Sequence, residues 1–251
     1  MEKDLEQQYL YDDKFLPLPP NKTQLRLYGH PCCAFTERVR LALALKKIPY
    51  QYVIIDFASR PEWFKKLGSE GKVPLLELKG KADYLFESMP VANYVEELTE
   101  NLLYPKDLIE KTKVRMLCSV IESIPTDFYI VLKSFGKNKD ALKNLKAHYT
   151  KIEARLAENK KGKFLLDYEH PTMADIVMFV HFRRAVLFEG TECDEAYKDI
   201  SFAGYPKLMK WMDDMMHYGP IAGHVVDKTN WMKFLKYFKD TTKFEFRWPA
   251  I

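Results

Sequence analysis

The sequence predicts an α/β domain followed by an all-helical domain. Short β-branched and aromatic runs alternate with helical patterns up to Tyr104, and behind that residue the strand signals nearly vanish. The length of 251 residues is enough for two domains of ordinary size. A composition that is 47% hydrophobic and 14% aromatic can form packed cores, so disorder is excluded as the main state.

The first residues are expected to form an extended arm outside the core. They are polar and acidic at first and then rich in proline, with Pro19 and Pro20 adjacent. We therefore expect an arm over residues 1–24, an α/β domain over 25–101 and a helical domain over 106–251.

The α/β region reads in order as strand, helix, strand, helix, two strands and helix. A turn at Gly29-His30-Pro31 separates the first strand from the first helix, and Pro49 blocks extension of that helix. Gly80 lies between the last two strands and indicates a hairpin. The strands that the first helix joins should be parallel, and the hairpin antiparallel. The expected elements cover residues 25–28, 35–47, 50–55, 61–67, 73–78, 84–86 and 88–98.

The second half of the chain is expected to be helical throughout. Thr172 and Asp175 have the spacing of a capping box, in which each side chain satisfies a backbone donor of the other residue. The apolar run directly behind it indicates a buried central helix. The expected helical segments cover residues 106–133, 139–157, a helix that begins at 172, 206–217 and 230–237.

Charge and composition exclude several classes of protein. The chain has 39 Lys and Arg against 35 Asp and Glu, a net charge of +4, so no nucleic-acid partner is expected. No apolar stretch approaches the roughly 20 residues of a membrane span. Met1-Glu2-Lys3-Asp4 does not resemble a signal peptide, so we expect a cytoplasmic protein without stable membrane association. The histidines and glycines show no metal or nucleotide motif, so neither cofactor is expected.

Two adjacent cysteines between the first strand and the first helix are the strongest chemical signal. Cys32 and Cys33 face the expected helix N-terminus, whose partial positive charge stabilises a thiolate. The fourth residue counted from Cys33 is Thr36, so an external thiol would have to complete any disulfide exchange. Cys118 and Cys193 are expected to be core residues.

Two further segments suggest ligand contacts. A cis bond between Val73 and Pro74 would turn the Val73 backbone outward to pair with a peptide-like ligand, whereas a trans proline would simply begin a strand. Glu87-Ser88 opens a helix whose amides favour an anionic group, and the alternative is a simple cap.

These residues resemble the glutathione transferases, most closely the omega class, whose catalytic cysteine lies in a Cys-Pro-Phe-x-x-Arg segment. Here the segment reads Cys33-Ala34-Phe35-Thr36-Glu37-Arg38. The resemblance implies a thioredoxin-like N-terminal domain that holds glutathione as co-substrate, a helical C-terminal domain that binds the second substrate, and a homodimer. The similarity covers essentially the whole chain, through Pro61-Glu62-Trp63-Phe64, Val73-Pro74-Leu75-Leu76-Glu77, Phe86-Glu87-Ser88, Thr172 to Asp175, and Pro206-Lys207-Leu208 with Trp211-Met212.

The resemblance also implies roles for individual residues. Cys33 would be the nucleophile that forms a mixed disulfide with glutathione, and Phe35 would line the site beside it. Arg60, where the family usually has lysine, would pair with the glycyl carboxylate. Val73, before a cis Pro74, would pair its backbone with the cysteinyl part of glutathione.

By the same resemblance, Glu87 and Ser88 would hold the γ-glutamyl end of glutathione. Arg184 and Trp231 would line the pocket for the acceptor. The chain departs from the family pattern at Ala34, where proline is usual, and at His181, where an aromatic residue is common.

The activity that the resemblance implies is a glutathione-dependent thiol transferase and dehydroascorbate reductase, an enzyme of detoxification. A non-catalytic protein of the same fold stays open as the alternative, either related to the intracellular chloride channels or a ligandin. Binding to liposomes under oxidation would indicate the first, and dye binding without turnover the second.

Overall fold

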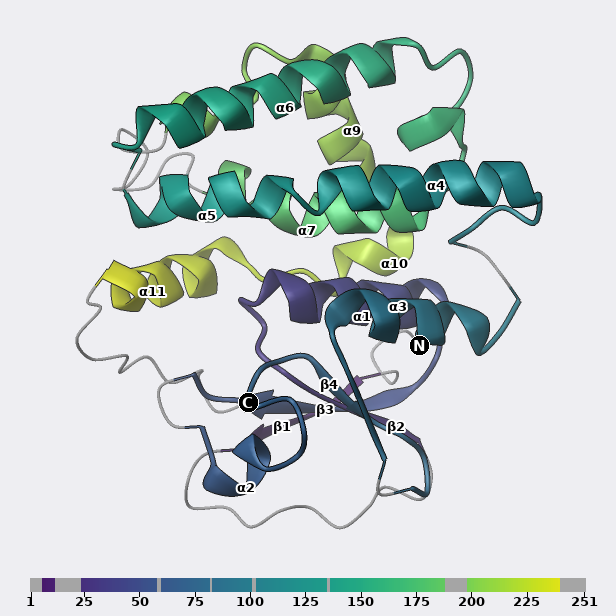
Figure 1. Ribbon diagram of the computed structural model, residues 1–251, viewed down its shortest axis with the longest axis vertical. Coiled ribbons are helices and arrows are strands. Elements are labelled where there is room, and N and C mark those ends of the chain that lie inside the picture. The colour runs from purple at the N-terminus through teal and green to yellow at the C-terminus, as the bar shows by residue number, and fades with distance from the viewer. Residues whose placement is uncertain are drawn as a thin grey trace. The chain divides into compact units, whose positions relative to one another are not determined.

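The computed structural model describes residues 6–11, 24–57, 60–81, 83–100, 103–134, 136–187 and 198–239. The chain forms two compact units (Figure 1). The first contains residues up to Glu100 and the segment from His224 onward, and the second contains Asn101–Gly223. The described residues 224–239, which the sequence assigned to the helical domain, thus belong to the first unit.

The first unit is built on a mixed sheet. In the described part of the chain the strand order is β1-β3-β2-β4-β5. The strands β2 and β3 are parallel and β4 and β5 are antiparallel, which confirms the expected pairing. Strand β4 is also antiparallel to β2. The strands are β1 (Glu6–Tyr11), β2 (Leu25–Gly29), β3 (Tyr50–Ile55), β4 (Leu75–Glu77) and β5 (Tyr84–Phe86).

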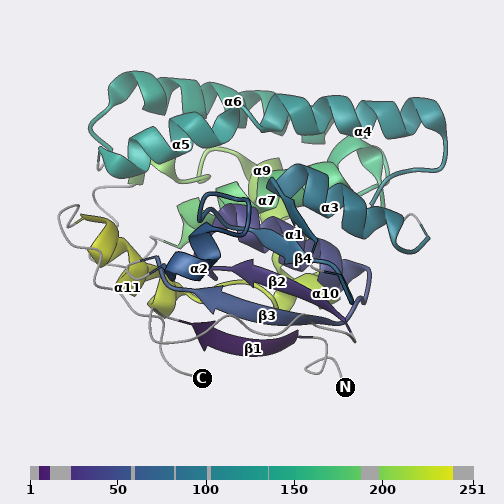
Figure 2. The same ribbon diagram turned by 60° about the horizontal axis from the view of Figure 1, so that its bottom comes forward.

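Strand β1 was not predicted from the sequence. It lies parallel to β3 at the edge of the sheet, with Glu6 opposite Tyr50 and Tyr11 opposite Ile55 (Figure 2). Part of the expected arm is therefore extended, but it pairs with the sheet instead of lying apart from it. The physical reason is that an uncovered β3 would present a row of unpaired backbone groups, which β1 satisfies.

Helices cover this sheet in the predicted order. Helix α1 (Ala34–Leu45) packs beside α3 (Ser88–Glu97), and the short α2 (Glu62–Lys65) follows β3. A buried ion pair of 3.0 Å joins Lys46 at the end of α1 to Glu96 of α3. Phe64 of α2 is fully buried against a cluster on the sheet that contains Tyr28, Val53, Ile55 and Leu75.

The second unit is helical. Nearly every residue of α7 (Met173–Val186) is buried, as expected for a central helix, and α4 and α9 pack against it. The predicted long segment 106–133 is two helices, because Pro125 lacks an amide proton and fits only the first turn of a new helix. The other elements are α4 (Leu108–Ile121), α5 (Ile124–Lys133), α6 (Lys139–Ala157), η1 (Leu165–Asp167), η2 (Lys198–Ile200), α9 (Pro206–Met216) and α10 (Gly219–Ala222).

The last described helix, α11 (Lys228–Lys239), belongs to the first unit. Phe234 of α11 lies against two aromatic rings of that unit, those of His30 and Phe57. Throughout the described ranges, no helix combines the length and the apolar character needed to cross a bilayer.

Candidate active site

Cys33 lies at the start of α1, where the sequence placed it. Its amide donates to the His30 carbonyl at 2.9 Å, which closes a tight turn behind β2. Cys33 is the N-cap residue, and its carbonyl accepts from the Glu37 amide at 2.9 Å. The Cys33 side chain is partly exposed, whereas Cys32 is buried. Of the two neighbours, Cys33 is therefore the one that a substrate can reach.

Two other positions that bear on the cysteine chemistry, Thr36 and Cys118, are buried. Thr36, one helical turn after Cys33, is fully buried, and its hydroxyl accepts from the His30 amide at 3.4 Å. Cys118 is buried on α4, as expected for a core residue. Cys193 lies outside the described residues. Thr36 thus has a structural role at the position where a dithiol enzyme has its second cysteine.

Arg38 connects Cys33's helix to the start of α3. Its Nη1 donates to Ser88 Oγ at 2.9 Å, and its guanidinium lies 5.7 Å from the centre of the Phe35 ring. Phe35, two residues after Cys33 in the sequence, is 37% exposed. In the sequence, Arg38 stands out only as the last residue of the cysteine motif. Its position in that motif was the available signal for a role in the site.

The bond between Val73 and Pro74 is cis, the one of the two alternatives that the family resemblance implied. Val73 is half-buried and Pro74 is buried directly before β4. The antiparallel pairing of β4 with β2 brings this segment beside the strand that leads to Cys33.

Glu87 has an unusual backbone conformation, with φ of 66° and ψ of 118°. A residue with a Cβ rarely adopts this conformation, which costs about 1–3 kcal/mol and is often found at ligand sites. Glu87 is exposed, and its carbonyl accepts from the Val91 amide at 3.0 Å in the first turn of α3. Ser88, the first helical residue, is buried. The two predicted ligands of the γ-glutamyl group therefore lie at a helix N-terminus.

Arg60 and His30 share one aromatic ring. The Arg60 guanidinium lies 5.1 Å from the centre of the Phe57 ring, and the His30 ring stacks on Phe57 at 4.2 Å. Arg60 is half-buried and donates to the Gly71 carbonyl at 3.3 Å. Burial, together with the charge of Arg60, lowers the pKa of His30 to about 3.

The predicted acceptor-pocket residues belong to different units. Trp231 stacks on Phe234 at 5.6 Å, and Phe234 lies 5.5 Å from His30, so α11 reaches the turn that carries Cys33. Arg184 is fully buried in the second unit and donates to the Val180 carbonyl within α7. His181 is also buried there, with its ring edge-on to Tyr129. A joint role of Arg184 and Trp231 stays a prediction.

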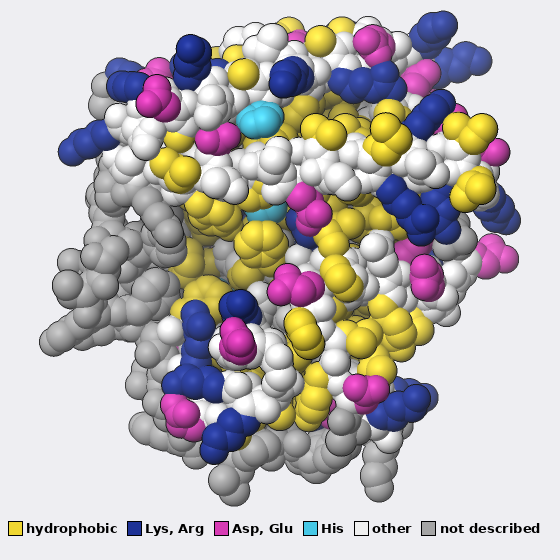
Figure 3. Space-filling view, in the orientation of Figure 1, with side chains coloured by type: hydrophobic (Ala, Val, Ile, Leu, Met, Phe, Trp, Pro, Cys, Tyr) yellow, Lys and Arg dark blue, Asp and Glu magenta, His cyan; other side chains and the backbone are white. Residues whose placement is uncertain are grey.

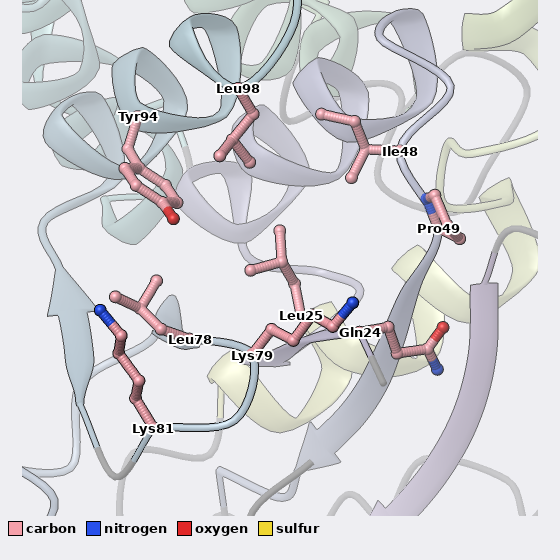
Figure 4. Close-up of a pocket in the computed structure, with 9 residues that line it drawn as sticks. All are labelled: Gln24, Leu25, Ile48, Pro49, Leu78, Lys79, Lys81, Tyr94 and Leu98. Carbon is pink, nitrogen blue, oxygen red and sulfur yellow. The ribbon is translucent and has the colours of Figure 1, made fainter. Parts of the chain in front are cut away.

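A cavity of about 390 Å³ lies elsewhere in the first unit (Figure 4). It opens where β2 begins, whereas Cys33 follows the other end of β2. The cavity is therefore separate from the cysteine. Its lining includes Leu25, Ile48, Leu78, Tyr94 and Leu98, together with Lys79 and Lys81.

Comparisons with known proteins agree with this geometry. Residues 27–101 match the family model of the glutathione S-transferase N-terminal domain, and residues 110–214 match that of the C-terminal domain. The chain is 27% identical to glutathione S-transferase omega-1 of Mus musculus over 228 residues, 90% of each protein. It is 28% identical to the pyrimidodiazepine synthase of Drosophila melanogaster over 227 residues, 88% of this chain and 89% of that protein.

The fold is also similar to that of solved structures. Glutathione transferase Omega 1C from Trametes versicolor matches with a TM-score of 0.70 at 19% identity, over 88% of this chain and 98% of that one. Taken together, the two family models cover most of the chain. It therefore belongs to the glutathione transferase family, in its omega class.

Proposed function

We propose that this protein is a glutathione-dependent thiol transferase that also reduces dehydroascorbate, with Cys33 as the nucleophile. The observation that carries the proposal is the position of Cys33, the partly exposed N-cap residue of α1. The sulfur lies at the helix N-terminus, the positive end of the helix dipole. A cysteine suits thiol exchange because sulfur both displaces thiols and is displaced by them.

The reaction proceeds through two exchanges. The Cys33 thiolate attacks the glutathionyl sulfur of a mixed disulfide, and the substrate leaves as a thiolate that takes up a proton. A second glutathione thiolate attacks the resulting disulfide, which regenerates Cys33 and releases oxidised glutathione. With dehydroascorbate, two glutathione molecules supply two electrons and two protons, and ascorbate and oxidised glutathione are formed. Thr36 is a buried alcohol, so an external thiol must complete the cycle.

The glutathione contacts follow the family pattern. Arg60, supported by Phe57, pairs with the glycyl carboxylate, and a guanidinium can bind it with two parallel hydrogen bonds. The Val73 backbone before Pro74 pairs with the cysteinyl part. Glu87 and Ser88 at the start of α3 bind the γ-glutamyl group, and Arg38 holds the Ser88 hydroxyl.

Phe35 is proposed to line the site beside Cys33. Trp231 and Arg184 are proposed to contact the acceptor, whose identity sets the substrate range. Because the cycle requires a reduced Cys33, a reducing compartment such as the cytoplasm is the proposed location.

The exchange of Cys33 for serine tests the proposal, and the neighbouring cysteine provides a matched control. Cys33→Ser should lower dehydroascorbate reductase and thiol transferase activity by a factor on the order of 10³ or more, with glutathione binding retained. Cys32→Ser should stay close to the parent rate, because Cys32 is buried. Turnover is measured in parallel with dehydroascorbate, a glutathione mixed disulfide and a conjugation substrate.

Two results would contradict the proposal. Reductase activity retained in Cys33→Ser would exclude Cys33 as the nucleophile. Dye binding without turnover of any of the three substrates would instead support the non-catalytic ligandin alternative.

A second candidate activity comes from the name of the Drosophila melanogaster relative, pyrimidodiazepine synthase. An assay for pyrimidodiazepine formation in the presence of glutathione tests it separately. Formation by the parent protein and not by Cys33→Ser would assign this reaction to the same cysteine.

We also propose that the protein is a homodimer. Exposed apolar side chains gather along α4 (Figure 3), among them Leu108, Met116 and Val120, which lie on one helix face and are 71%, 64% and 61% exposed. Met116→Lys should give a monomer in size-exclusion chromatography with light scattering. Met209→Lys, at an exposed position of α9, should leave the dimer intact. A monomeric parent protein would refute the dimer, and a dimeric Met116→Lys would refute this interface.

A further inference from the structure

His30 ties the turn before α1 together through three hydrogen bonds. Its carbonyl accepts from the Cys33 amide at 2.9 Å, and its Nδ1 accepts from the Cys32 amide at 3.2 Å. Its own amide donates to the Thr36 hydroxyl at 3.4 Å. One residue thus contacts the amides of both cysteines and the first turn of the helix that Cys33 caps. These hydrogen bonds therefore link the orientation of His30 to the backbone conformation at Cys33.

Aromatic groups enclose the His30 side chain, which is 1% exposed. The imidazole stacks on Phe57 with an angle of 16° between the rings, and Phe234 of α11 lies tilted against it. The Phe57 ring also supports the Arg60 guanidinium. The aromatic contacts restrict the imidazole to one orientation, in which Nδ1 faces the amide of Cys32.

The hydrogen bond to the Cys32 amide requires a neutral imidazole, because only an unprotonated Nδ1 can accept. Burial and the nearby Arg60 charge lower the pKa of His30 to about 3, so the ring is neutral at neutral pH. A neutral ring provides no positive charge to pair with a thiolate. The contribution of His30 to the site is therefore one of geometry.

We propose that His30 is a positioning residue for Cys33: its imidazole, held by Phe57 and Phe234, fixes the Cys32 amide through Nδ1 and so directs the Cys33 thiol toward glutathione. The inference rests on the proposed role of Cys33 as the nucleophile. In this role His30 affects the reaction through the backbone at Cys32 and Cys33, and it does not touch the reacting atoms.

Two substitutions separate the hydrogen bond from the ring. His30→Asn places an amide oxygen near the position of Nδ1 and keeps the acceptor, but it removes the stacked ring. His30→Phe keeps a stacked ring and removes the acceptor. Both are made in a Cys32→Ser background, in which the amide at position 32 is retained and Cys33 is the remaining thiol of the pair.

The first readout is the rate at which iodoacetamide alkylates Cys33 at fixed pH, followed by mass spectrometry of the peptide. His30→Phe should slow alkylation and lower kcat of dehydroascorbate reduction about tenfold, as expected for the loss of one hydrogen bond that orients a reacting group. KM for glutathione should change less than kcat. His30→Asn should remain within about threefold of the parent in both measurements, because the acceptor is restored. His217→Asn, at an exposed histidine after α9, is the control and should change neither.

Equal losses in His30→Asn and His30→Phe would mean that ring packing alone matters, and would overturn the proposal. Parent-like rates in both would overturn it as well. If His30→Phe does not fold, His30→Leu removes the same acceptor, and the same comparison with His30→Asn applies. Alkylation reports on Cys33 whether or not Cys33 is the catalytic residue. Slowed alkylation in His30→Phe together with an active Cys33→Ser would therefore refute the proposed function and leave the positioning by His30 supported.

Discussion

The N-terminus of α1, at Cys33, and that of α7, at Thr172, differ in whether a side chain of the protein caps the helix. At α7 the Asp175 carboxylate accepts from the Thr172 amide at 2.7 Å and from the Thr172 hydroxyl at 2.8 Å. The same carboxylate also accepts from the Leu165 amide and the Trp211 indole, both at 2.9 Å. At α1 the Cys33 side chain makes no capping hydrogen bond, and it is partly exposed.

The difference shows how one backbone feature serves two purposes. Both helix N-termini favour negative charge. At α7 a carboxylate of the chain itself occupies that position and joins three segments of the core. At α1 the position is left to a sulfur that a substrate can reach. The α1 start, where Cys33 makes no capping hydrogen bond and is partly exposed, is the one of the two at which we propose the chemistry.

The strongest test of this comparison is the loss of the Asp175 carboxyl group at α7. Asp175→Ala removes the acceptor of several buried donors and should lower the free energy of unfolding by about 4 kcal/mol. The midpoint and slope of urea unfolding measure the change. Asp213→Ala, at an exposed carboxylate of α9, should cost less than about 1 kcal/mol. A similar small loss for both variants would mean that the Asp175 network is not a structural cap.

The turn at α1 should respond to pH. In the folded protein the pKa of His30 is about 3, against 6.5 when exposed, so below pH 6.5 the unfolded chain binds a proton that the folded protein does not. Stability is therefore lost as the pH falls, by about 2 kcal/mol between pH 6.5 and about pH 5. Urea midpoints at the two pH values measure this loss.

The His30→Asn variant is the control for the pH effect, because it lacks the titrating group and should show a smaller decrease. Burial raises the pKa of Asp175, which acts in the opposite direction at low pH. That contribution is the same in both proteins and cancels in the comparison. An unchanged pH dependence in His30→Asn would show that other groups cause the loss.

Substitution of Glu87, at the start of α3, should change the free energy of unfolding less than the two changes above. The sign of this change tests whether the Glu87 backbone is strained. Glu87→Gly relieves the positive φ and should raise the free energy of unfolding by about 1 kcal/mol, while KM for glutathione increases. Glu97→Gly, at an exposed position near the end of the same helix, should lower it by about 0.5–1 kcal/mol. Thermal unfolding and steady-state kinetics measure the two effects. Destabilisation by both substitutions would indicate that Glu87 is not strained.

The structural features that the sequence predicted correctly are those determined by residues close together in the chain. Alternating apolar runs, Pro49 and Gly80 were enough for the order of elements from β2 to α3, and the capping box at Thr172 needed only residues three positions apart. The cysteine at a helix start followed from the same local patterns. These features are visible in sequence because each one is determined within a few residues.

The remaining features depend on contacts between distant segments. The pairing of β1 with β3, the bond from Arg38 to Ser88 and the contact of Phe234 with His30 join parts of the chain that have no common pattern. A short amphipathic helix such as α11 can pack on either unit, and its sequence does not distinguish between them. The break between α4 and α5 could have been predicted from Pro125.

The return of α11 to the first unit also has a consequence for synthesis. The sheet strands and α1 leave the ribosome early, but the ring of Phe234 that covers His30 emerges only after the whole of Asn101–Gly223. At about 5–20 residues per second, this interval lasts several seconds or more. The His30 side chain, in the turn that leads to Cys33, is therefore covered by Phe234 only after the helical unit has been synthesised.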